Sequence, residues 1–227
     1  MTAKRGRGQR AGLTRQAILQ AAVRLADQEG LAALSMRRIA AELGVEAMTL
    51  YHHVPNKNAL LDGMVEQLLS ETVPPLGVSS WQESLREYAH SFLAVLSAHP
   101  NLIPLAASRP AMTPQNLRTM ETVLESLRSS GFELTQAYDV VRSLAAFVLG
   151  HVAAHLDPIP ACPPDQPRGR SIDVDAYPLF FEALKKSDPI SRFDFALEAL
   201  LHGFDASRTA SPSSGPQAAG EVGPDER

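Results

Sequence analysis

The chain has 227 residues, of which 44% are hydrophobic and 20% are charged, and its formal net charge is -4. A chain of this length and composition can bury a core in one large domain or in two smaller ones. No uninterrupted apolar run approaches the roughly 20 residues of a membrane-spanning helix, and the start lacks the apolar segment of a secretory signal, so we expect a cytoplasmic protein. The single cysteine, Cys162, has no partner for an intramolecular disulfide and no neighbouring ligand pair, which argues against a structural zinc site.

The charge is distributed unevenly along the chain. Residues 1–57 contain nine Lys or Arg and four Asp or Glu, a net charge of +5, whereas the remainder contains 12 basic and 21 acidic residues, a net charge of -9. A cationic first quarter on an anionic body favours contact between the N-terminal part and a polyanion, and a merely solubilising basic arm is the alternative. The arm carries Lys4, Arg5, Arg7 and Arg10, which are suited to follow phosphates or to enter a minor groove.

Hydrophobic periodicity predicts four helices in the first 72 residues. Capping and stop residues place them at about 14–29, 35–44, 46–53 and 56–72. Two helices joined by a tight glycine turn, here at Gly44, after a packing helix are typical of a helix-turn-helix. The third helix is only about 10 Å long at 1.5 Å per residue, so its neighbours must stabilise it, and it fits a major groove roughly 12 Å wide.

The third helix carries side chains that suit DNA. They offer hydroxyls, imidazoles and small apolar groups, which hydrogen-bond phosphates or contact base edges and thymine methyls. The candidates are Ala47, Met48, Thr49, Tyr51, His52 and His53. A solvated histidine pair at a helix end is the alternative for His52 and His53, and the sequence context decides between the two.

The run LSMRRIAAELGVEAMTLYHHVPNKNALLDGM, residues 34–64, resembles the DNA-binding domain of the TetR family of bacterial transcriptional repressors. The resemblance covers about residues 13–69 and rests on a Ser-x-Arg second helix, a Leu-Gly-Val turn, a Thr-Leu-Tyr-x-His-Val recognition helix and an Asn-Lys-x-x-Leu-Leu fourth helix. It implies that DNA is contacted by Arg37, Thr49, Tyr51, His53 and Lys57. It further implies that Ala47, Met48 and His52 select the operator. Ala47 replaces the glutamine of the tetracycline repressor, so that protein's operator preference does not transfer.

From about residue 81 onward the periodicity is again helical, without the basic excess. We expect helices at 81–98, 114–129, 135–155 and 193–204. The helix at 135–155 is apolar around more than one face and needs cover on several sides. In the TetR family the last long helices of two subunits pack as a four-helix bundle, and 135–155 and 193–204 resemble that pair, which would place Val148 and Leu200 in the interface. An intramolecular core is the alternative, although symmetric dimers are the commonest oligomers.

The C-terminal half also resembles the tetracycline-repressor subclass, through Trp81-Gln82, Phe92, Ser108-Arg109-Pro110, Gly131-Phe132 and Phe147-x-Leu149-Gly150. The resemblance implies a ligand pocket. At three positions where the tetracycline repressor holds the magnesium ion bound to its drug, however, this chain has Leu105, Ala146 and Ala154. A leucine does not ligate a hard cation, so we expect neither magnesium-tetracycline nor any other metal or cofactor. The residues expected to line a cavity, each with plain core as its alternative, are Tyr88, Phe92, Leu105, Arg109, Met120, Leu124, Phe147 and His151.

A metal site or a hydrolase is the rival hypothesis for the C-terminal half. His151 and His155 stand four residues apart, with Asp157 nearby. However, no glutamate lies between the histidines, no third ligand has matching spacing, and no GxSxG nucleophile motif occurs. We therefore expect that the protein is not an enzyme.

The sequence thus predicts an all-α protein with an N-terminal three-helix helix-turn-helix DNA-binding domain and a larger helical domain for ligand binding and dimerisation. The expected parts are a flexible basic arm at 1–12, the DNA-binding domain at 13–55, a connecting helix at 56–72, the ligand-binding and dimerisation domain at 73–206, with a mobile loop at 157–175, and a disordered tail at 207–227.

The expected function is that of a ligand-responsive transcriptional regulator, a repressor rather than an activator. It binds a palindromic double-stranded DNA operator as a homodimer and is released by a small organic effector. The alternative is an architectural DNA-binding protein without ligand control. The large acidic helical body argues against that alternative, because coating DNA requires positive charge.

Overall fold

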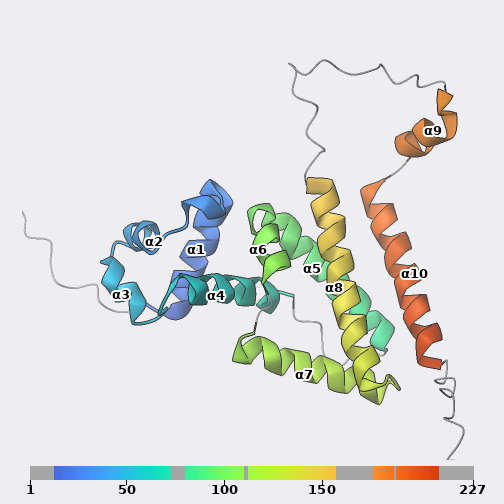
Figure 1. The fold of residues 1–227 in the computed structure, drawn as a ribbon, viewed down its shortest axis with the longest axis horizontal. Helices are drawn as coiled ribbons and strands as arrows, with labels where there is room; N and C mark the ends of the chain where they lie inside the picture. The colour runs from blue at the N-terminus through green and yellow to red at the C-terminus, as the bar shows by residue number, and fades with distance from the viewer. Residues whose placement is uncertain (1–12, 73–79, 110–111, 157–175, 187, 210–227) are drawn as a thin grey trace, which may run out of the picture.

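The computed structural model describes residues 13–72, 80–109, 112–156, 176–186 and 188–209, and these residues form helices and no strand (Figure 1). This confirms the predicted all-α class. The basic arm, the loop at 157–175 with Cys162 and nearly all of the predicted tail lie outside the described residues.

The N-terminal domain contains α1 (Arg15–Glu29), η1 (Leu31–Ala33), α2 (Met36–Glu42), α3 (Ala47–Tyr51) and α4 (Lys57–Ser70). Side-chain oxygens of Thr14, Ser35 and Asn56 cap α1, α2 and α4 by accepting a hydrogen bond from the backbone N–H three residues later, at 2.9–3.2 Å. Gly30 and Gly44 have φ values of 81° and 66°, which L side chains rarely adopt, and they allow the chain to turn after α1 and α2.

The recognition segment is shorter as a helix than the predicted 46–53. Glu46 has extended backbone, and the N–H groups of His53 and Val54 both donate to the carbonyl of Leu50, at 3.0 and 2.8 Å. The two histidines therefore lie in the turn that closes α3. Fully buried Leu50 and Val54 attach this short segment to the core of the domain, which includes Ile18, Leu25, Ile39, Leu60 and Met64.

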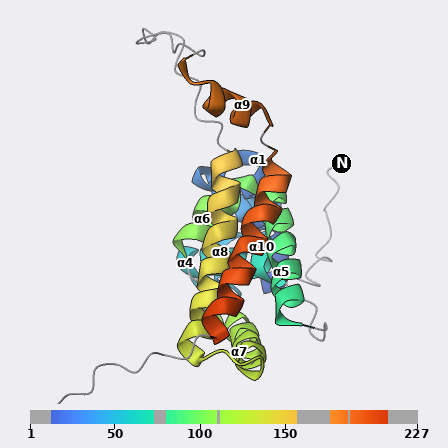
Figure 2. The same ribbon diagram turned by 90° about the vertical axis from the view of Figure 1, so that its right-hand side faces the viewer.

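The C-terminal domain contains α5 (Trp81–Ala98), η2 (Pro100–Leu102), α6 (Ile103–Ser108), α7 (Pro114–Ser129), α8 (Leu134–Leu156), α9 (Pro178–Lys186) and α10 (Pro189–Thr209). Helices α5, α8 and α10 pack side by side, and α7 crosses near one end of α8 (Figures 1 and 2). Their shared core includes Phe92, Leu96, Leu144, Val148, Phe193 and Leu197.

Four short elements, η1, η2, α6 and α9, were not predicted, because three to nine residues carry too little periodicity. Helix α10 continues to Thr209, three residues beyond the predicted domain boundary at residue 206. The guanidinium of Arg208 donates to Asp205 at 2.7 Å and to the carbonyl of Ser130 at 3.2 Å, which ties the end of α10 to the turn before α8.

Helix α8 is the one described helix with the length and apolarity of a membrane span, and the bent pair of α5 with η2 and α6 would be a second if counted as one span. One face of α8 packs within the chain. Val140, Leu144, Val148 and Val152 are buried in the core of the C-terminal domain. In its most apolar stretch, 33% of the residues are buried.

Candidate DNA-binding surface and effector domain

The predicted DNA contacts gather on α3, the turn after it and the start of α4. Met48 is 70% exposed and Tyr51 is 42% exposed. His52, His53 and Lys57 are also exposed, whereas Ala47 and Thr49 are half-buried. Because Leu50 points inward, the remaining side chains of this one short helix are presented together. Side chains presented from one short helix fit within a single major groove.

Two adjacent arginines at the start of α2 have different surroundings. Arg38 forms ion pairs with Glu29 of α1 and, at 3.9 Å, with Glu42 one turn later. The hydrogen bond from Arg38 lowers the pKa of the Glu29 carboxyl below its ordinary value. Arg37 is exposed, and no ion pair engages it within the described ranges. Of the two cations, Arg37 is the one available to a phosphate, and the sequence alone could not distinguish them.

Close packing between α1 and α4 supports this surface from behind. Arg15 and Glu66 form an ion pair at 2.9 Å. A side-chain carbon placed on Gly63 would lie only 2.6 Å from the Cδ2 atom of Leu19, so a larger residue at this position requires the Leu19 side chain to shift or α4 to move away from α1. The start of α4, which carries Lys57, is consequently fixed relative to α1.

The segment η2–α6 belongs to both domains. Leu102 and Leu105 are buried in the core of the N-terminal domain, whereas Ile103 is buried in the core of the C-terminal domain. At the end of α6, Arg109 donates to Asp62 at 2.7 Å and to Asn58 at 3.0 Å, both on α4. Two predicted pocket residues, Leu105 and Arg109, therefore contact the DNA-binding domain in this structure.

The other six predicted pocket residues surround the core of the C-terminal domain. Tyr88 and Phe92 of α5 stack with their ring centroids 5.8 Å apart. Phe147 stacks on Phe193 at 5.0 Å, and His151 meets the same ring edge-on at 4.9 Å. Met120 and Leu124 pack against this core from α7. Phe193 lies at the start of the helix predicted at 193–204, and its contact with Phe147 was not predicted, because 46 positions separate the two residues.

Burial raises the pKa of Tyr88 to about 12, while a hydrogen bond with the Thr72 side chain acts in the opposite direction. Tyr88 is therefore a neutral hydroxyl at physiological pH. Thr72 is itself buried just beyond α4, and its hydroxyl donates to the carbonyl of Leu69 at 2.7 Å. The phenol of Tyr88 thus offers a polar group within largely apolar surroundings.

A small hollow lies between α4 and α7, with a cavity volume of about 30 Å³. It is lined by Glu66, Leu69, Ser70, Gln115, Asn116 and Thr119. A cavity of this size holds a water molecule but no organic effector. An effector bound at this place would require α7 to move away from α4.

No cluster of three or more potential metal ligands occurs among the described side chains. Leu105 is buried in an apolar core, and Ala146 and Ala154 lie on an exposed face of α8. The side chain of His155 and the whole of Asp157 are outside the described residues, so the structure leaves the rival metal site untested there.

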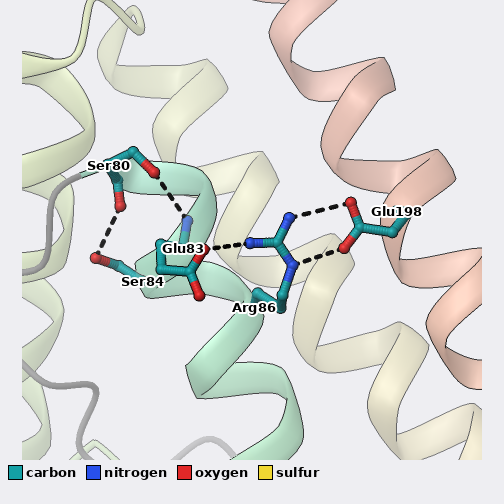
Figure 3. Close-up of polar contacts among 5 residues, drawn as sticks. All are labelled: Ser80, Glu83, Ser84, Arg86 and Glu198. Atoms are coloured by element: carbon teal, nitrogen blue, oxygen red, sulfur yellow. Dashed lines mark hydrogen bonds and ion pairs between the residues drawn. The ribbon is translucent and has the colours of Figure 1, made fainter.

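An ion-pair network holds α10 against α5 (Figure 3). Arg86 of α5 binds both carboxylate oxygens of Glu198 on α10, at 2.6 and 3.0 Å, and also Glu83 at 2.6 Å. The hydrogen bond from Arg86 lowers the pKa of Glu198. Ser80 caps α5 by accepting from the backbone N–H of Glu83, so the network begins at a fixed helix end.

The outer faces of α8 and α10 are turned away from the N-terminal domain (Figures 1 and 2). The prediction that Val148 contacts a second subunit is wrong, because Val148 is 0% exposed within a single chain. Leu200 is half-buried, and its assignment stays a prediction. The exposed aromatic residue of α10 is Phe195, at 77%.

Two family models match the chain. The model described as bacterial regulatory proteins, tetR family, matches residues 18–64, and the model described as tetracyclin repressor-like, C-terminal domain, matches residues 73–208. The chain belongs to the TetR family. It is 38% identical over 152 residues to the transcriptional repressor DrrR1 of Streptomyces coeruleorubidus, which covers 66% of this chain and 56% of that protein. It is 33% identical over 215 residues to the class D tetracycline repressor of Escherichia coli, covering 88% of this chain and 93% of that one.

Solved structures of TetR-family proteins have the same fold. Apo ActR from Streptomyces coelicolor is 30% identical and superposes with a TM-score of 0.71, covering 87% of this chain and 97% of that one. A single-substitution variant of TetR from Acinetobacter baumannii in complex with minocycline is 26% identical, with a TM-score of 0.68, and covers 90% of this chain and 100% of that one.

Membership of the family confirms the predicted function class. The chain is a ligand-responsive transcriptional repressor and not an enzyme, and its partners are operator DNA, a second copy of itself and a small molecule. Nothing in the comparisons supports an architectural protein without ligand control. TetR-family regulators are soluble DNA-binding proteins.

Proposed function

We propose that the homodimer acts in the cytoplasm, occupies a palindromic operator through α3, and leaves it when a mostly apolar organic molecule binds the C-terminal domain without a metal ion. The observation that supports this choice of effector is the chemistry of the three residues that correspond to the magnesium site of the tetracycline repressor. Leu105 is buried among apolar side chains, and Ala146 and Ala154 offer no ligand atoms on their side chains. A hard cation needs oxygen or imidazole ligands, which these positions lack.

The proposed DNA contacts are the exposed cations, rings and hydroxyl around α3. Arg37 and Lys57 flank the helix and bind phosphates, because an exposed cation at the edge of a groove meets the backbone first. Met48 and Tyr51 are large exposed side chains on α3 and reach base edges or thymine methyls. Two copies of α3 read half-sites one helical turn apart, about 34 Å, which makes the operator palindromic.

The effector is proposed to bind among the aromatic residues of α5 and α8 and the apolar residues of α7. Tyr88, Phe92 and Phe147 supply ring surface, and the Tyr88 hydroxyl and the His151 imidazole supply a few hydrogen-bonding groups. Relatives support an effector of this kind. ActR, 29–30% identical, has been solved in complex with actinorhodin and with (S)-DNPA.

The contacts of α6 provide a route from effector to DNA. Leu105 packs in the core of the DNA-binding domain, and Arg109 holds Asp62 of α4. A ligand that displaces α6 therefore moves α4, which in turn is packed on α1 through Gly63. Release follows because the ligand binds more tightly to a dimer geometry that no longer matches the operator.

The outer faces of α8 and α10 are proposed as the subunit interface, with Phe195 at its centre. Ala199 and Gly203 follow Phe195 at four-residue intervals, so they share its face of α10 and allow a partner helix to approach closely. An aromatic side chain left 77% exposed in one chain gains most from burial by a second. The Arg86–Glu198 ion pair holds α10 in place for this contact.

The test is operator release on a DNA fragment that the wild-type protein selects from a random-sequence library. Actinorhodin should release the protein and raise its melting temperature, because a ligand that binds only the folded state stabilises it. Minocycline with magnesium, with and without a chelator, is the comparison. Release by minocycline that requires magnesium and is abolished by the chelator would refute the metal-free pocket.

A matched pair of variants tests the route. Arg109→Ala removes the bonds to Asp62 and Asn58 and should weaken release without weakening effector binding. Arg208→Ala removes an equally exposed arginine–aspartate contact that lies away from α4, and should leave release unchanged. Equal effects of the two substitutions would contradict a specific role for α6.

A further inference from the structure

A second polar contact joins the two domains at the C-terminal end of α1. The Nδ1 atom of His99, at the end of α5, lies 2.8 Å from the Oδ2 atom of Asp27 in the last turn of α1. The Nδ2 group of Asn101 in η2 donates to the backbone carbonyls of Ala26 and Asp27, at 3.0 Å each. We call these three side chains, Asp27, His99 and Asn101, the α1 junction.

The α1 junction meets the backbone as well as side chains. The last carbonyls of a helix lack partners within it, and Asn101 donates to two carbonyls of the last turn of α1, of which that of Ala26 also accepts from the N–H of Gly30 at 2.8 Å. The next residue, Leu102, is fully buried in the core beneath α1, so polar and apolar contacts hold the same turn. His99 and Asp27 are only 21% and 27% exposed, and the Oδ1 atom of Asp27 is buried with no donor among the described residues.

The position of the α1 junction gives it a mechanical consequence. In Figure 1, α2 and α3 lie on the side of the N-terminal domain away from α5 and α6, whereas the junction lies on the side that faces them. A change of angle at the junction therefore displaces α3 as the far end of a rigid, packed unit. In a homodimer, this angle in each subunit sets the separation of the two recognition helices.

We propose that Asp27, His99 and Asn101 are positioning residues for operator binding, which fix the DNA-binding domain on the body so that the two α3 helices match one half-site spacing. None of the three lies near α3, so they act through the orientation of α1. A loosened junction leaves each α3 able to bind its half-site but lowers the effective concentration of the second α3 at the second half-site. Preference for one spacing falls as a consequence.

The test uses the full chain and the selected palindromic operator, without any effector. Three DNA fragments are compared: the operator, the same sequence with one base pair inserted at its centre, and a single half-site. Asp27→Asn and Asn101→Ala are the informative variants, because each removes part of the junction and keeps the fold. His99→Ala is unsuitable, since it would leave both oxygens of a largely buried carboxylate without a partner.

The wild-type preference for the operator over the lengthened fragment should fall by about tenfold in both variants, while half-site affinity stays within about twofold of wild type. His90→Ala is the matched control. It breaks another histidine–aspartate pair of α5, with Asp194 of α10 at 3.3 Å, which does not touch the DNA-binding domain. This control should keep the wild-type spacing preference.

Two results would overturn the proposal. Variants that keep the full spacing preference would show that the junction does not set the angle, and variants that lose half-site and operator affinity in parallel would show only structural damage to the domain. The proposal rests on operator binding by a dimer and not on the identity of the effector. Both of those results concern the variants and would overturn this proposal alone. A wild-type protein without any spacing preference would instead contradict the palindromic operator of the proposed function, so failure of this proposal is distinguishable from failure of the proposed function.

Discussion

Replacement of Arg37 by alanine should change the salt dependence of operator binding, and replacement of its neighbour Arg38 should not. Arg37 is exposed at the start of α2, whereas Arg38 is held by Glu29 and Glu42. A dimer presents Arg37 twice, so Arg37→Ala removes two phosphate contacts. Each contact contributes about 0.9 to the slope of log K against log salt, so the slope should become less steep by about 1.8.

That slope has a measurable consequence. Between 50 and 200 mM salt, the affinity of the Arg37→Ala variant should fall about tenfold less than that of the wild-type protein. Fluorescence anisotropy of a labelled operator at several salt concentrations gives both slopes, and circular dichroism checks that the variants are folded. An unchanged slope for Arg37→Ala, or an equal change for Arg38→Ala, would refute the assignment of Arg37 as the free cation of this pair.

Three further predictions concern α3, the subunit interface and Tyr88. Tyr51→Ala and Lys57→Ala should each weaken operator binding by about 1 to 3 kcal/mol, and equal binding of wild type to operator and scrambled DNA would contradict this. Phe195→Glu should yield a folded monomer in sedimentation, whereas Val148→Glu should unfold the chain, because it buries an unpaired charge; a dimeric Phe195→Glu variant would count against the interface. The pKa of Tyr88 is raised to about 12 in the folded state, so its stabilising effect is complete below pH 10 and is lost as the pH rises from about 10 to 12, where the unfolded phenol ionises first. Chemical unfolding of Tyr88→Phe should therefore show a shallower alkaline loss of stability than wild type, and identical curves would contradict the shift.

Local sequence determined most of the N-terminal domain. Thr14, Ser35 and Asn56 cap helices through bonds that span three residues, and Gly30 and Gly44 end them through their own backbone angles. Such signals need no distant partner, so the order of the first four helices was predicted correctly. Within α3, Leu50 is the buried residue and Met48 and Tyr51 are exposed, whereas Ala47 and Thr49 of the predicted contact set are half-buried.

Only the tertiary structure decided which apolar face meets which neighbour. Helix α8 is apolar around most of its circumference, so periodicity could not tell that Val148 faces the core of its own chain, nor that Phe195 of α10 is left exposed. Leu105 was predicted in a ligand pocket, yet it completes the core of the DNA-binding domain, because the short η2–α6 segment lies across α1 and α4.

The polar contacts between domains were likewise beyond the sequence. Asp27 and His99 are separated by 72 positions, and Asp62 and Arg109 by 47. Neither pair was predicted, and Arg109 was expected to line the ligand pocket. The two arginines at 37 and 38 are identical in sequence terms and differ only because Glu29 lies beside one of them. Charge pairing at such separations depends on where the backbone brings two helices together, and that position is fixed by the packing of the whole fold rather than by any local pattern.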